Sequence, residues 1–469
     1  MDNRAAPEIP GIRQPANVTQ DIRLLVCKLL NSPKPAKTFP GSQPISFHHS
    51  DIEEKLLQQD YYVCEKTDGL RGLMLIVINP VTKEQGCFII DRENNYYQVN
   101  GFRFPRLPKQ SRKELLETFQ DGTLIDGELV LQTNPVTKVK ELRYLMFDCL
   151  AINGRCIVQS PTSSRLAHLG KEFFKPYYDL RSLYPAQCAN FPFKISMKHM
   201  SFSVDLVKVA NSLDKLPHVS DGLIFTPVTT PYVVGGKDSL LLKWKPETEN
   251  TVDFKMILDI PKAEDTSLSK NDPNRFFYNY GVKPSFHLYI WQGGADVNAR
   301  LHDFEQPFSK KELEVLDRTY KKFADLDVSD SQWAELKSLG EPLNGRIVEC
   351  AKDQETGVWR MLRFRDDKLN GNYVSVVQKV LESISDSVKI EDLEEATAQM
   401  RSNWEKRQME KKRGFQEVQD ARRVSQPAPP TLPAPQATEE PKYIDDDDDE
   451  ELWSDDDDQS DTEVKRQKL

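Results

Sequence analysis

Short apolar runs bounded by Gly, Pro and Asn dominate residues 61–150, and they restrict this part of the chain to a β-sheet. Each run is rich in β-branched and aromatic residues and has the length of a strand. The runs are residues 61–65, 71–78, 87–91, 124–131 and 142–150. Helical spacing follows in 162–180 and 204–213, and strand-like runs return in 223–226, 240–244 and 252–258. The pattern predicts an α+β domain with a largely antiparallel sheet.

A second, smaller block of strand-like runs begins after about residue 247. Its runs are residues 286–291, 345–351 and 358–364, and residues 310–324 have helical spacing. Several short strands in a block of this size are typical of a small barrel or sandwich. Helical spacing returns in residues 373–384 and in the highly charged residues 391–423, where Glu and Lys lie four positions apart.

The charge of the chain is concentrated in its last part. Residues 425–469 hold 15 acidic and 4 basic residues, a charge of −11, which leaves 59 bases and 58 acids, a charge of +1, for residues 1–424. Residues 426–441 are a Pro/Ala linker and 445–461 an acidic run, and neither buries enough apolar surface to offset chain entropy. We therefore expect domains at 1–245 and 246–390, a charged helical extension at 391–424, and a disordered tail at 425–469.

Several classes of protein are disfavoured by what the sequence lacks. No apolar run approaches the roughly 18–20 residues of a membrane span, and the N-terminus has no basic start followed by an apolar stretch, so we expect neither membrane insertion nor secretion. The seven cysteines form no CxxC pair, which favours a reducing compartment and ordinary buried thiols. The histidines form no HExxH or finger spacing, so no permanent zinc site is expected.

The segment Lys66-Thr-Asp-Gly-Leu-Arg71 lies between two predicted strands. A lysine at a strand end acts as a nucleophile only when its amine is neutral, and desolvation with neighbouring cations favours the neutral form. The alternative is structural, because Asp68-Gly69 is a good turn dipeptide. On these six residues alone, a hairpin turn is the better-supported interpretation.

Lys243 and Lys245 lie two residues apart on one face of a predicted strand, in Leu240-Leu-Leu-Lys-Trp-Lys-Pro246. An amphipathic edge strand explains this spacing by itself. Two lysines pointing the same way would also bind phosphate oxygens, and they would lower the pKa of a third lysine between them.

Acidic residues interrupt two otherwise apolar strands. Asp126 and Glu128 share one face of Thr123–Leu129, and Asp221 opens the apolar run that ends at Thr226. Carboxylates on a buried strand are costly unless they are paired or bind a metal. Ion pairs at a sheet edge are the alternative for Asp126 and Glu128.

Three arginines alternate near the end of the second block, at positions 360, 363 and 365. A solvated strand face explains this alternation most simply. A mobile phosphate clamp is the alternative, because guanidinium groups pair bidentately with phosphate.

Together and in this order, these segments resemble the motifs of the covalent nucleotidyltransferases, the superfamily of ATP-dependent ligases and mRNA capping guanylyltransferases. The matching segments are KxDGxR at 66–71, DGE at 126–128, the aromatic motif at 144–148, Asp221-Gly222, KxK at 243–245 and RxDK at 365–368. The resemblance spans roughly residues 40–390. It is strongest to the guanylyltransferase branch in its fungal, single-function form, because LLKWKP, residues 250–254 and the RxDK motif are its marks.

The resemblance implies a nucleotidyltransferase domain followed by an OB-fold, with Lys66 as the nucleophile that attacks GTP. The implied GTP-binding residues are Asp68, Gly69, Arg71, Glu128, Phe147, Lys198, Lys243, Lys245, Arg365, Asp367 and Lys368, and the implied metal-binding residues are Asp221 and Asp253. The metal is Mg²⁺ or Mn²⁺. In this assignment Arg71 and Glu128 hold the ribose, Phe147 stacks on guanine, and Lys198 donates to its O6 atom. The two KxK lysines hold the α-phosphate, and the RxDK residues reach the pyrophosphate when the domains close together.

The resemblance also implies the partners and the compartment. The acceptor is RNA with a 5′-diphosphate end, and the location is the nucleus. Because the chain has no HCxxxxxR motif and 65 residues before Lys66, we expect a separate RNA triphosphatase subunit. The phosphorylated C-terminal repeats of RNA polymerase II are the other expected partner. Basic clusters at 411–413 and 465–466 would serve nuclear import, or are simply solvated.

Two alternatives from other classes stay open on the sequence. One is an ATP-dependent polynucleotide ligase, which shares the lysine motif. The other is a non-catalytic interaction protein whose nucleotide site has decayed. The acidic run has two interpretations as well: it keeps the chain dissolved, or it mimics nucleic acid and contacts a basic partner.

Overall fold

The computed structural model describes residues 7–134, 136–246, 250–294, 310–353 and 356–424. It divides the chain into two compact units, Met1–Arg401 and Ser402–Leu469. The described residues of the first unit form two large β-sheets, a closed β-barrel and a separate two-stranded hairpin. The predicted tail at 425–469 lies outside the described residues. Within the described part of the chain, no helix is long and apolar enough to cross a membrane.

The larger sheet is antiparallel except where β8 runs parallel to β10. Its order is β1 (Ile12–Arg13), β6 (Tyr96–Val99), β5 (Gln85–Asp91), β4 (Leu70–Ile78), β7 (Thr123–Thr133), β8 (Lys140–Ile152) and β10 (Lys194–Met197), with β9 (Arg155–Cys156) paired to β8. The sequence runs that predicted its central strands are confirmed. These runs read as almost continuously apolar because the sheet is covered on both faces.

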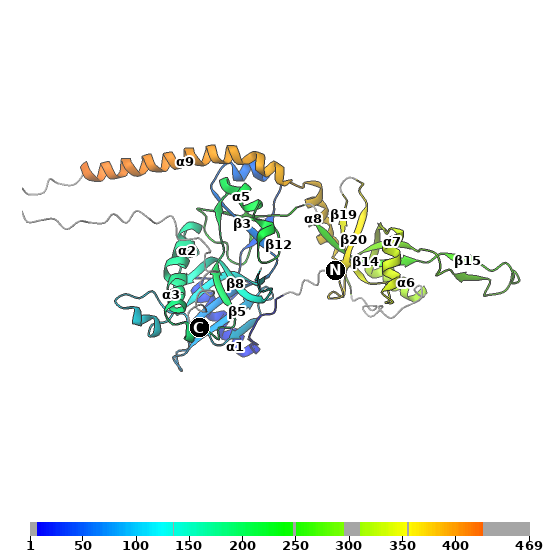
Figure 1. The fold of residues 1–469 in the computed structure, drawn as a ribbon, viewed down its shortest axis with the longest axis horizontal. Helices are drawn as coiled ribbons and strands as arrows, with labels where there is room; N and C mark the ends of the chain where they lie inside the picture. The colour runs from blue at the N-terminus through cyan, green and yellow to red at the C-terminus, as the bar shows by residue number, and fades with distance from the viewer. Residues whose placement is uncertain (1–6, 135, 247–249, 295–309, 354–355, 425–469) are drawn as a thin grey trace, which may run out of the picture. The chain divides into compact units, whose positions relative to one another are not determined.

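The two faces of the larger sheet follow the side-chain alternation of β4. Figure 1 shows the ribbon of this sheet. Leu73 and Leu75 pack with helix α1 (Ala16–Leu29), whereas Met74 and Ile76 share a core with Phe173 on the other face. The second face is covered by the continuous helical segment α2 (Thr162–His168), η3 (Leu169–Phe174) and α3 (Lys175–Leu183). The sheet is therefore the middle layer of three, as strand periodicity requires.

The smaller sheet carries the strand on which Lys66 lies. Its order is β11 (Ser201–Phe202), β3 (Tyr61–Thr67), β12 (Ser220–Pro227), β13 (Lys237–Trp244) and β2 (Gln43–Ser46), with β13 and β2 parallel. The remaining short helices of this region are η1 (Ile52–Leu56), η2 (Arg112–Leu116), α4 (Pro185–Cys188), η4 (Ser203–Asp205), α5 (Leu206–Ala210) and η5 (Leu213–Lys215). Helix α5 packs against β3.

The second block forms a closed barrel, so the predicted OB-fold is confirmed. The order is β14 (Thr251–Asp259), β17 (Ser285–Trp291), β18 (Tyr320–Asp327), β20 (Trp359–Phe364) and β19 (Ile347–Lys352), which pairs with β14 again. Helix α7 (Asp330–Ser338) lies between β18 and β19 in the chain. The core is formed by the inward side chains of the strands, including Phe254, Leu288, Val348 and Trp359.

One prediction in this block is wrong. We expected a helix over residues 310–324, but α6 (Lys310–Thr319) ends earlier and the chain continues at once as strand β18. Tyr320 and Leu326 are buried, and β18 pairs with both β17 and β20. Closing the barrel therefore overrides the local helical spacing, since pairing on both sides satisfies the backbone of β18.

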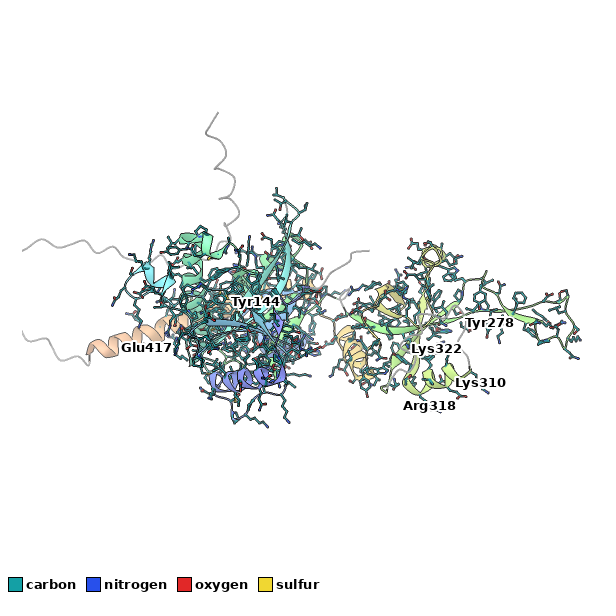
Figure 2. All side chains as sticks on the ribbon, turned by 90° about the horizontal axis from the view of Figure 1, so that it is seen from below. Tyr144, Tyr278, Lys310, Arg318, Lys322 and Glu417 are labelled. Atoms are coloured by element: carbon teal, nitrogen blue, oxygen red, sulfur yellow. The ribbon has the colours of Figure 1, made fainter. Side chains whose placement is uncertain are left out.

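A hairpin arm and two helices complete the described residues. The arm consists of β15 (Lys262–Glu264) and β16 (Phe276–Tyr278), and it carries Tyr278 away from the barrel (Figure 2). Helix α8 (Val374–Ser385) packs on the barrel, and α9 (Ile390–Val424) is the predicted charged helix. The segment between these helices returns to the smaller sheet, because the Trp244 Nε1 atom donates a hydrogen bond to the carbonyl of Val388 at 2.7 Å.

Candidate active site

Lys66 lies near the end of β3, where it is bound to the first acidic residue of the adjacent strand β12. Its Nζ atom is 2.6 Å from Oδ1 of Asp221, and the Nζ atom of Lys245 is 2.6 Å from Oδ2 of the same carboxylate. Burial alone would raise the pKa of Asp221, but the charges of the two lysines hold it below its ordinary value. Asp221 therefore stays ionised and fixes both ammonium groups. The Lys66 side chain is 23% exposed, so a ligand can reach its amine.

Lys243 lies on β13, two residues before Lys245, and its side chain is half-buried. Burial, followed by the repulsion of Lys245 and Lys66, lowers the pKa of Lys243. No acidic side chain in the described part of the chain forms an ion pair with Lys243. The three lysines share a single carboxylate, that of Asp221, so the cluster carries a net positive charge. A bound anion would neutralise this charge.

The hairpin turn, which was the structural alternative for Asp68-Gly69, does not form. Strand β3 belongs to the smaller sheet and β4 to the larger, so these two residues carry the chain from one sheet into the other. Gly69 is required there, because a Cβ atom at this position would lie 2.5 Å from the carbonyl oxygen of Leu129. Its N–H group donates to the Glu128 carboxylate, whereas Asp68 is exposed. The lysine and the arginine of the motif therefore stand at the junction of two sheets.

Arg71 is bound by the first carboxylate of the DGE segment. Its Nε and Nη2 atoms donate to the two Asp126 oxygens at 3.1 and 2.7 Å, and the Tyr232 hydroxyl donates to the same carboxylate. Burial opposes the charge of Arg71, but Asp126 keeps its pKa above the ordinary value. Asp126 therefore forms an ion pair, which was the alternative to metal binding for this residue. The pair lies on a central strand of the sheet and not at its edge.

Glu128 lies directly opposite Arg71 in the register of β4 and β7. Burial raises the pKa of Glu128 despite the charges of Lys198, Lys66 and Arg71 around it. Its carboxylate therefore faces the same space as these cations. Of the two acidic residues on this face of β7, it is the one whose carboxylate lacks an ion pair within the residues described.

Phe147 and Lys198 lie together at the side of this space. The Arg71 guanidinium carbon is 5.4 Å from the centre of the Phe147 ring and 5.5 Å from that of Phe39, so the cation lies over two aromatic rings. The Nζ atom of Lys198 is 6.0 Å from the Phe147 ring centre. Lys198 is 7% exposed, and its ammonium group donates to the hydroxyl of Thr67.

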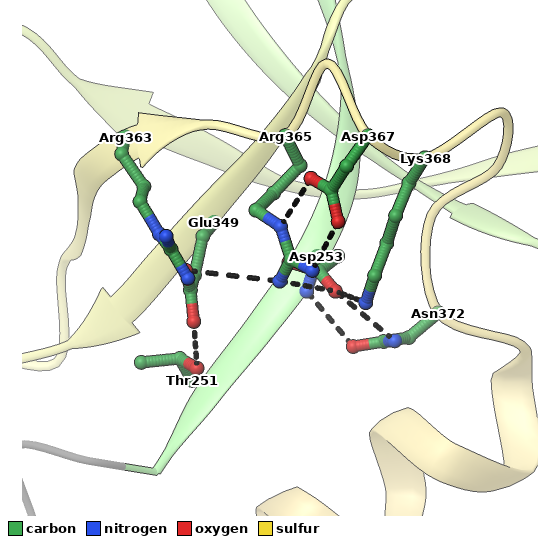
Figure 3. Close-up of polar contacts among 8 residues, drawn as sticks. All are labelled: Thr251, Asp253, Glu349, Arg363, Arg365, Asp367, Lys368 and Asn372. Carbon is green, nitrogen blue, oxygen red and sulfur yellow. Dashed lines mark hydrogen bonds and ion pairs between the residues drawn. The ribbon is translucent and has the colours of Figure 1, made fainter. Parts of the chain in front are cut away.

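The RxDK residues form their own polar cluster on the barrel (Figure 3). Arg365 and Lys368 both bind Asp253, and the Arg365 Nη2 atom is 2.8 Å from Oδ2 of Asp367. This pairing lowers the pKa of Asp367 to about 2. Arg363 binds Glu349 at 2.5 Å instead. In this state the barrel cations are neutralised by barrel carboxylates.

Sequence reasoning missed several residues that hold the site together. Tyr232 and Phe39 fix Arg71, and Asp148 of the aromatic motif is bound by the buried Arg165 at 2.7 and 2.8 Å. Arg92 contributes to the positive field at Lys243 and binds Gln43. These residues come from distant parts of the chain without a shared spacing, so no pattern in the sequence pairs them. Further missed residues are Glu65 and His218.

A lysine cluster at the junction of two sheets, followed by an OB-type barrel with its own cluster of cations, defines a two-domain nucleotidyltransferase of the ligase-like kind. Comparison with known sequences narrows this class. The family described as mRNA capping enzyme, catalytic domain, matches residues 4–247, and the family described as mRNA capping enzyme, C-terminal domain, matches residues 249–394. The chain belongs to the mRNA capping enzymes, and within them to the fungal guanylyltransferase subunits.

Relatives that cover nearly the whole chain support this assignment. The mRNA-capping enzyme subunit alpha of Kluyveromyces lactis is 69% identical over 470 residues, which is 100% of each chain. The subunit of the same name from Saccharomyces cerevisiae is 70% identical over 450 residues, 95% of this chain and 98% of the relative. A solved ATP-dependent DNA ligase of bacteriophage T7 covers 70% of this chain and 98% of its own, at 15% identity and a TM-score of 0.29, too low to support an argument.

Proposed function

We propose that this chain transfers GMP from GTP to the 5′-diphosphate end of RNA through a lysyl-GMP intermediate on Lys66. In the first step the Lys66 ammonium group loses a proton to solvent and the resulting amine attacks the α-phosphorus; an N–P bond forms, the nitrogen releases a second proton, and the bond to the oxygen bridging the α- and β-phosphates breaks to release pyrophosphate. In the second step the terminal phosphate oxygen of the RNA attacks the same phosphorus, and the N–P bond breaks as the lysine nitrogen takes up a proton. The product is an inverted GpppN cap.

The observation that carries this proposal is the lysine cluster around Asp221. The transferring phosphoryl group is highly anionic, so the main requirement is fixed positive charge at its oxygens. Lys243 has no counter-ion among the described residues, so its charge is available to a phosphate oxygen. Lys245 is held in position beside it by Asp221. These two observations support both lysines as ligands of the α-phosphate. Asp221 orients the Lys66 amine from 2.6 Å. Because its pKa is held low, Asp221 is suited to orienting and not to keeping a proton.

We assign the guanine and the ribose to the side chains around Arg71. We infer that Phe147 stacks on guanine and that Lys198 donates to its O6 atom, since these side chains lie together and Lys198 is kept charged. Glu128, with its carboxylate directed at the same space, is the ribose ligand in this proposal. Arg71 is held by Asp126, so it contributes to the ribose site from a fixed position.

A divalent metal, Mg²⁺ or Mn²⁺, is implied by the family. Mg²⁺ is usually bound through one or two carboxylates together with substrate phosphates, and Asp221 offers such a carboxylate at the proposed phosphate site. Both candidate carboxylates are engaged by cations in the structure, Asp221 by Lys66 and Lys245 and Asp253 by Arg365 and Lys368, so an ion at either one would replace such a contact. We propose Asp221 as the metal ligand because it lies within the lysine cluster proposed to hold the α-phosphate. When bound, the ion would share the neutralisation of phosphate charge.

The RxDK residues would act on the leaving pyrophosphate only after a change of partners. Arg365 and Lys368 are bound to Asp253 in the structure, so contact with phosphate must replace these ion pairs. We propose that closure of the barrel over bound GTP provides this exchange and that opening exposes lysyl-GMP to RNA. Asp367 holds the Arg365 fork during the exchange.

The family assignment also supports a wider setting for the reaction. We propose a separate RNA triphosphatase subunit that supplies the diphosphate end, and recruitment by the phosphorylated repeats of RNA polymerase II. The location that fits these partners is the nucleus. Co-purification of the chain with each partner from nuclear extract, lost when the partner is depleted, tests this setting.

Labelling with α-³²P nucleotides, a divalent metal and denaturing electrophoresis tests the chemistry. We expect a labelled band from GTP and not from ATP, released by acid and reversed by pyrophosphate. Lys66→Arg keeps the charge but offers no nucleophilic amine, so it should abolish the band. The matched control is Lys55→Arg, because Lys55 is also partly buried and forms a 2.7 Å ion pair with Asp51. A band that survives Lys66→Arg would place the nucleophile elsewhere, and a band from ATP alone would indicate a ligase.

A further inference from the structure

Lys198 is one of a set of polar side chains in contact with one another, together with Thr67, Glu65 and His218. Its Nζ atom donates to Thr67 and lies 3.8 Å from Oε1 of Glu65. Burial alone would lower the pKa of Lys198, but neighbouring Cys64 and Glu65 favour the charged form and the pKa is raised. Glu65 and Thr67 are two residues apart on β3, so they present one face of that strand to Lys198.

His218 lies next to Glu65 and contacts Gln132 as well. Its side chain is 5% exposed, its Nδ1 atom is 3.1 Å from Nε2 of Gln132, and its Nε2 atom is 3.6 Å from Oε1 of Glu65. With the Gln132 amide nitrogen as the donor, Nδ1 accepts and the ring proton resides on Nε2. This Nε2 atom is buried without a hydrogen-bond partner in the structure, and the nearby Glu65 carboxylate, 3.6 Å away, is an acceptor that a small movement would bring into reach.

The backbone on each side of His218 is fixed by a neighbouring strand end. The carbonyl of Pro217 accepts from the N–H of Thr133 at 2.8 Å, and the carbonyl of Val219 accepts from the N–H of Asp68 at 3.0 Å. His218 therefore has little freedom to shift relative to β3 and β7. The imidazole gives the carboxylate a fixed neighbour on the side opposite the lysine.

We propose that Glu65 and His218 are positioning residues for recognition of the nucleobase: His218 fixes the Glu65 carboxylate, and this carboxylate fixes the Lys198 ammonium where it meets the base. This inference rests on the proposed function, in which Lys198 donates to guanine O6. A lysine ammonium has a flexible four-carbon stem and rotates freely, so its direction must come from its partners. The hydrogen bond to Thr67 and the Glu65 charge 3.8 Å away hold the ammonium group from one side and leave hydrogen for the ligand.

Base discrimination follows from the direction of that hydrogen. Guanine presents an acceptor at position 6, whereas adenine presents an amino group that donates. A fixed donor therefore accepts guanine and leaves adenine with two donors facing each other. A loosely held ammonium would lose its bond to guanine while its penalty against adenine would fall, because it could move aside.

The experiment compares initial rates of covalent labelling by GTP, ITP and ATP, each over a range of concentrations, in the full chain. The variants are Glu65→Gln, His218→Ala and His218→Gln, with Lys198→Met as the reference for loss of the donor. The matched control is His168→Ala, which removes a histidine–glutamate contact of 2.6 Å with Glu172 far from the Lys66 motif in sequence. ITP keeps the O6 acceptor but lacks the 2-amino group, so an effect shared by GTP and ITP does not arise from a contact to that amino group.

We expect Glu65→Gln and His218→Ala to raise KM for GTP and ITP together by about tenfold, the scale of one misplaced hydrogen bond to a charged group. Labelling by ATP should be unchanged or improved, and kcat should change less than KM. His218→Gln should retain part of the preference for GTP, since its amide can still donate to Glu65. His168→Ala should behave as the parent chain does.

Three results would overturn the inference. A parallel loss of labelling by all three nucleotides would mean that this set of polar side chains serves only the fold, as would a fall in kcat without a rise in KM. Retained preference for GTP in Glu65→Gln and His218→Ala, with preference lost in Lys198→Met, would show that Lys198 needs neither residue. If Lys198→Met itself keeps the preference, the proposed role of Lys198 fails instead.

Discussion

The ion pair between Arg71 and Asp126 gives a quantitative prediction about stability. The Asp126 side chain is fully buried and Arg71 donates to both of its oxygens. Asp126→Asn keeps the shape of the side chain but removes its charge and turns one acceptor into a donor. Two donors, the Arg71 guanidinium and the Tyr232 hydroxyl, then compete for a single acceptor oxygen.

Removing one partner of a buried ion pair costs about 3–5 kcal/mol because the remaining charge is left uncompensated. Arg71 keeps Glu128 opposite it and is 15% exposed, so we expect the lower end, about 3 kcal/mol. At roughly 2.1 cal/mol/K of unfolding entropy per residue, a unit of about 400 residues shifts by about 1.2 °C per kcal/mol, so Tm should fall by about 3–4 °C. Thermal unfolding followed by circular dichroism measures this shift directly.

Glu141→Gln is the matched control, because Glu141 forms a 2.9 Å pair with Lys194 in the same sheet but both side chains are exposed. An exposed pair contributes up to about 1 kcal/mol, so the control should hardly change Tm. Adding Arg71→Met to Asp126→Asn should restore part of the lost stability, because the unpaired charge is gone. Equal effects of Asp126→Asn and Glu141→Gln would refute the idea that Arg71 depends on this carboxylate.

Three further changes have expected outcomes. The pKa of Asp221 is lower in the folded chain than in the unfolded one, so the stabilisation that its charge provides is present above about pH 4 and is lost as pH falls through the folded pKa. Asp221→Asn should therefore lower the free energy of unfolding at pH 7. In acid the variant and the parent chain should have the same stability, and urea unfolding at each pH measures this difference. Gly222→Ala places a Cβ atom 2.1 Å from the Trp244 carbonyl oxygen at a φ of +147°, so it should cost at least about 1–3 kcal/mol and reduce labelling by GTP. Trp244→Phe leaves the Val388 carbonyl without its donor and should lower the free energy of unfolding by about 1–3 kcal/mol in the same assay.

Strand-forming runs in the sequence were sufficient to predict most of the fold. The runs at 71–78 and 124–131 became β4 and β7 because β-branched residues fill a sheet that is covered on both faces. The helix expected over 310–324 failed at Tyr320, where the barrel required another strand. Local spacing reports a preference of a few tenths of a kcal/mol per residue, which the closure of a barrel easily exceeds.

The site was predicted less evenly than the fold. Motif spacing placed Lys66, Lys243 and Lys245 in one neighbourhood, and the structure brings them together around Asp221. Spacing could not show that Arg71 is held by Asp126, because that contact depends on the pairing of two strands. The turn at Asp68-Gly69 looked like a hairpin for a similar reason, since a turn dipeptide does not say which sheet the next strand joins.

The passage from β3 to β4 sets the length of the lysine motif. Two residues separate a strand of the smaller sheet from a strand of the larger one, and side chains alternate between faces at every step of β4. One inserted residue would exchange the faces, turning Leu73 away from α1 and Arg71 away from Asp126. The interval of five residues from the lysine to the arginine therefore sets which face of the larger sheet each β4 side chain occupies. The residues inside this interval could vary more freely than their number.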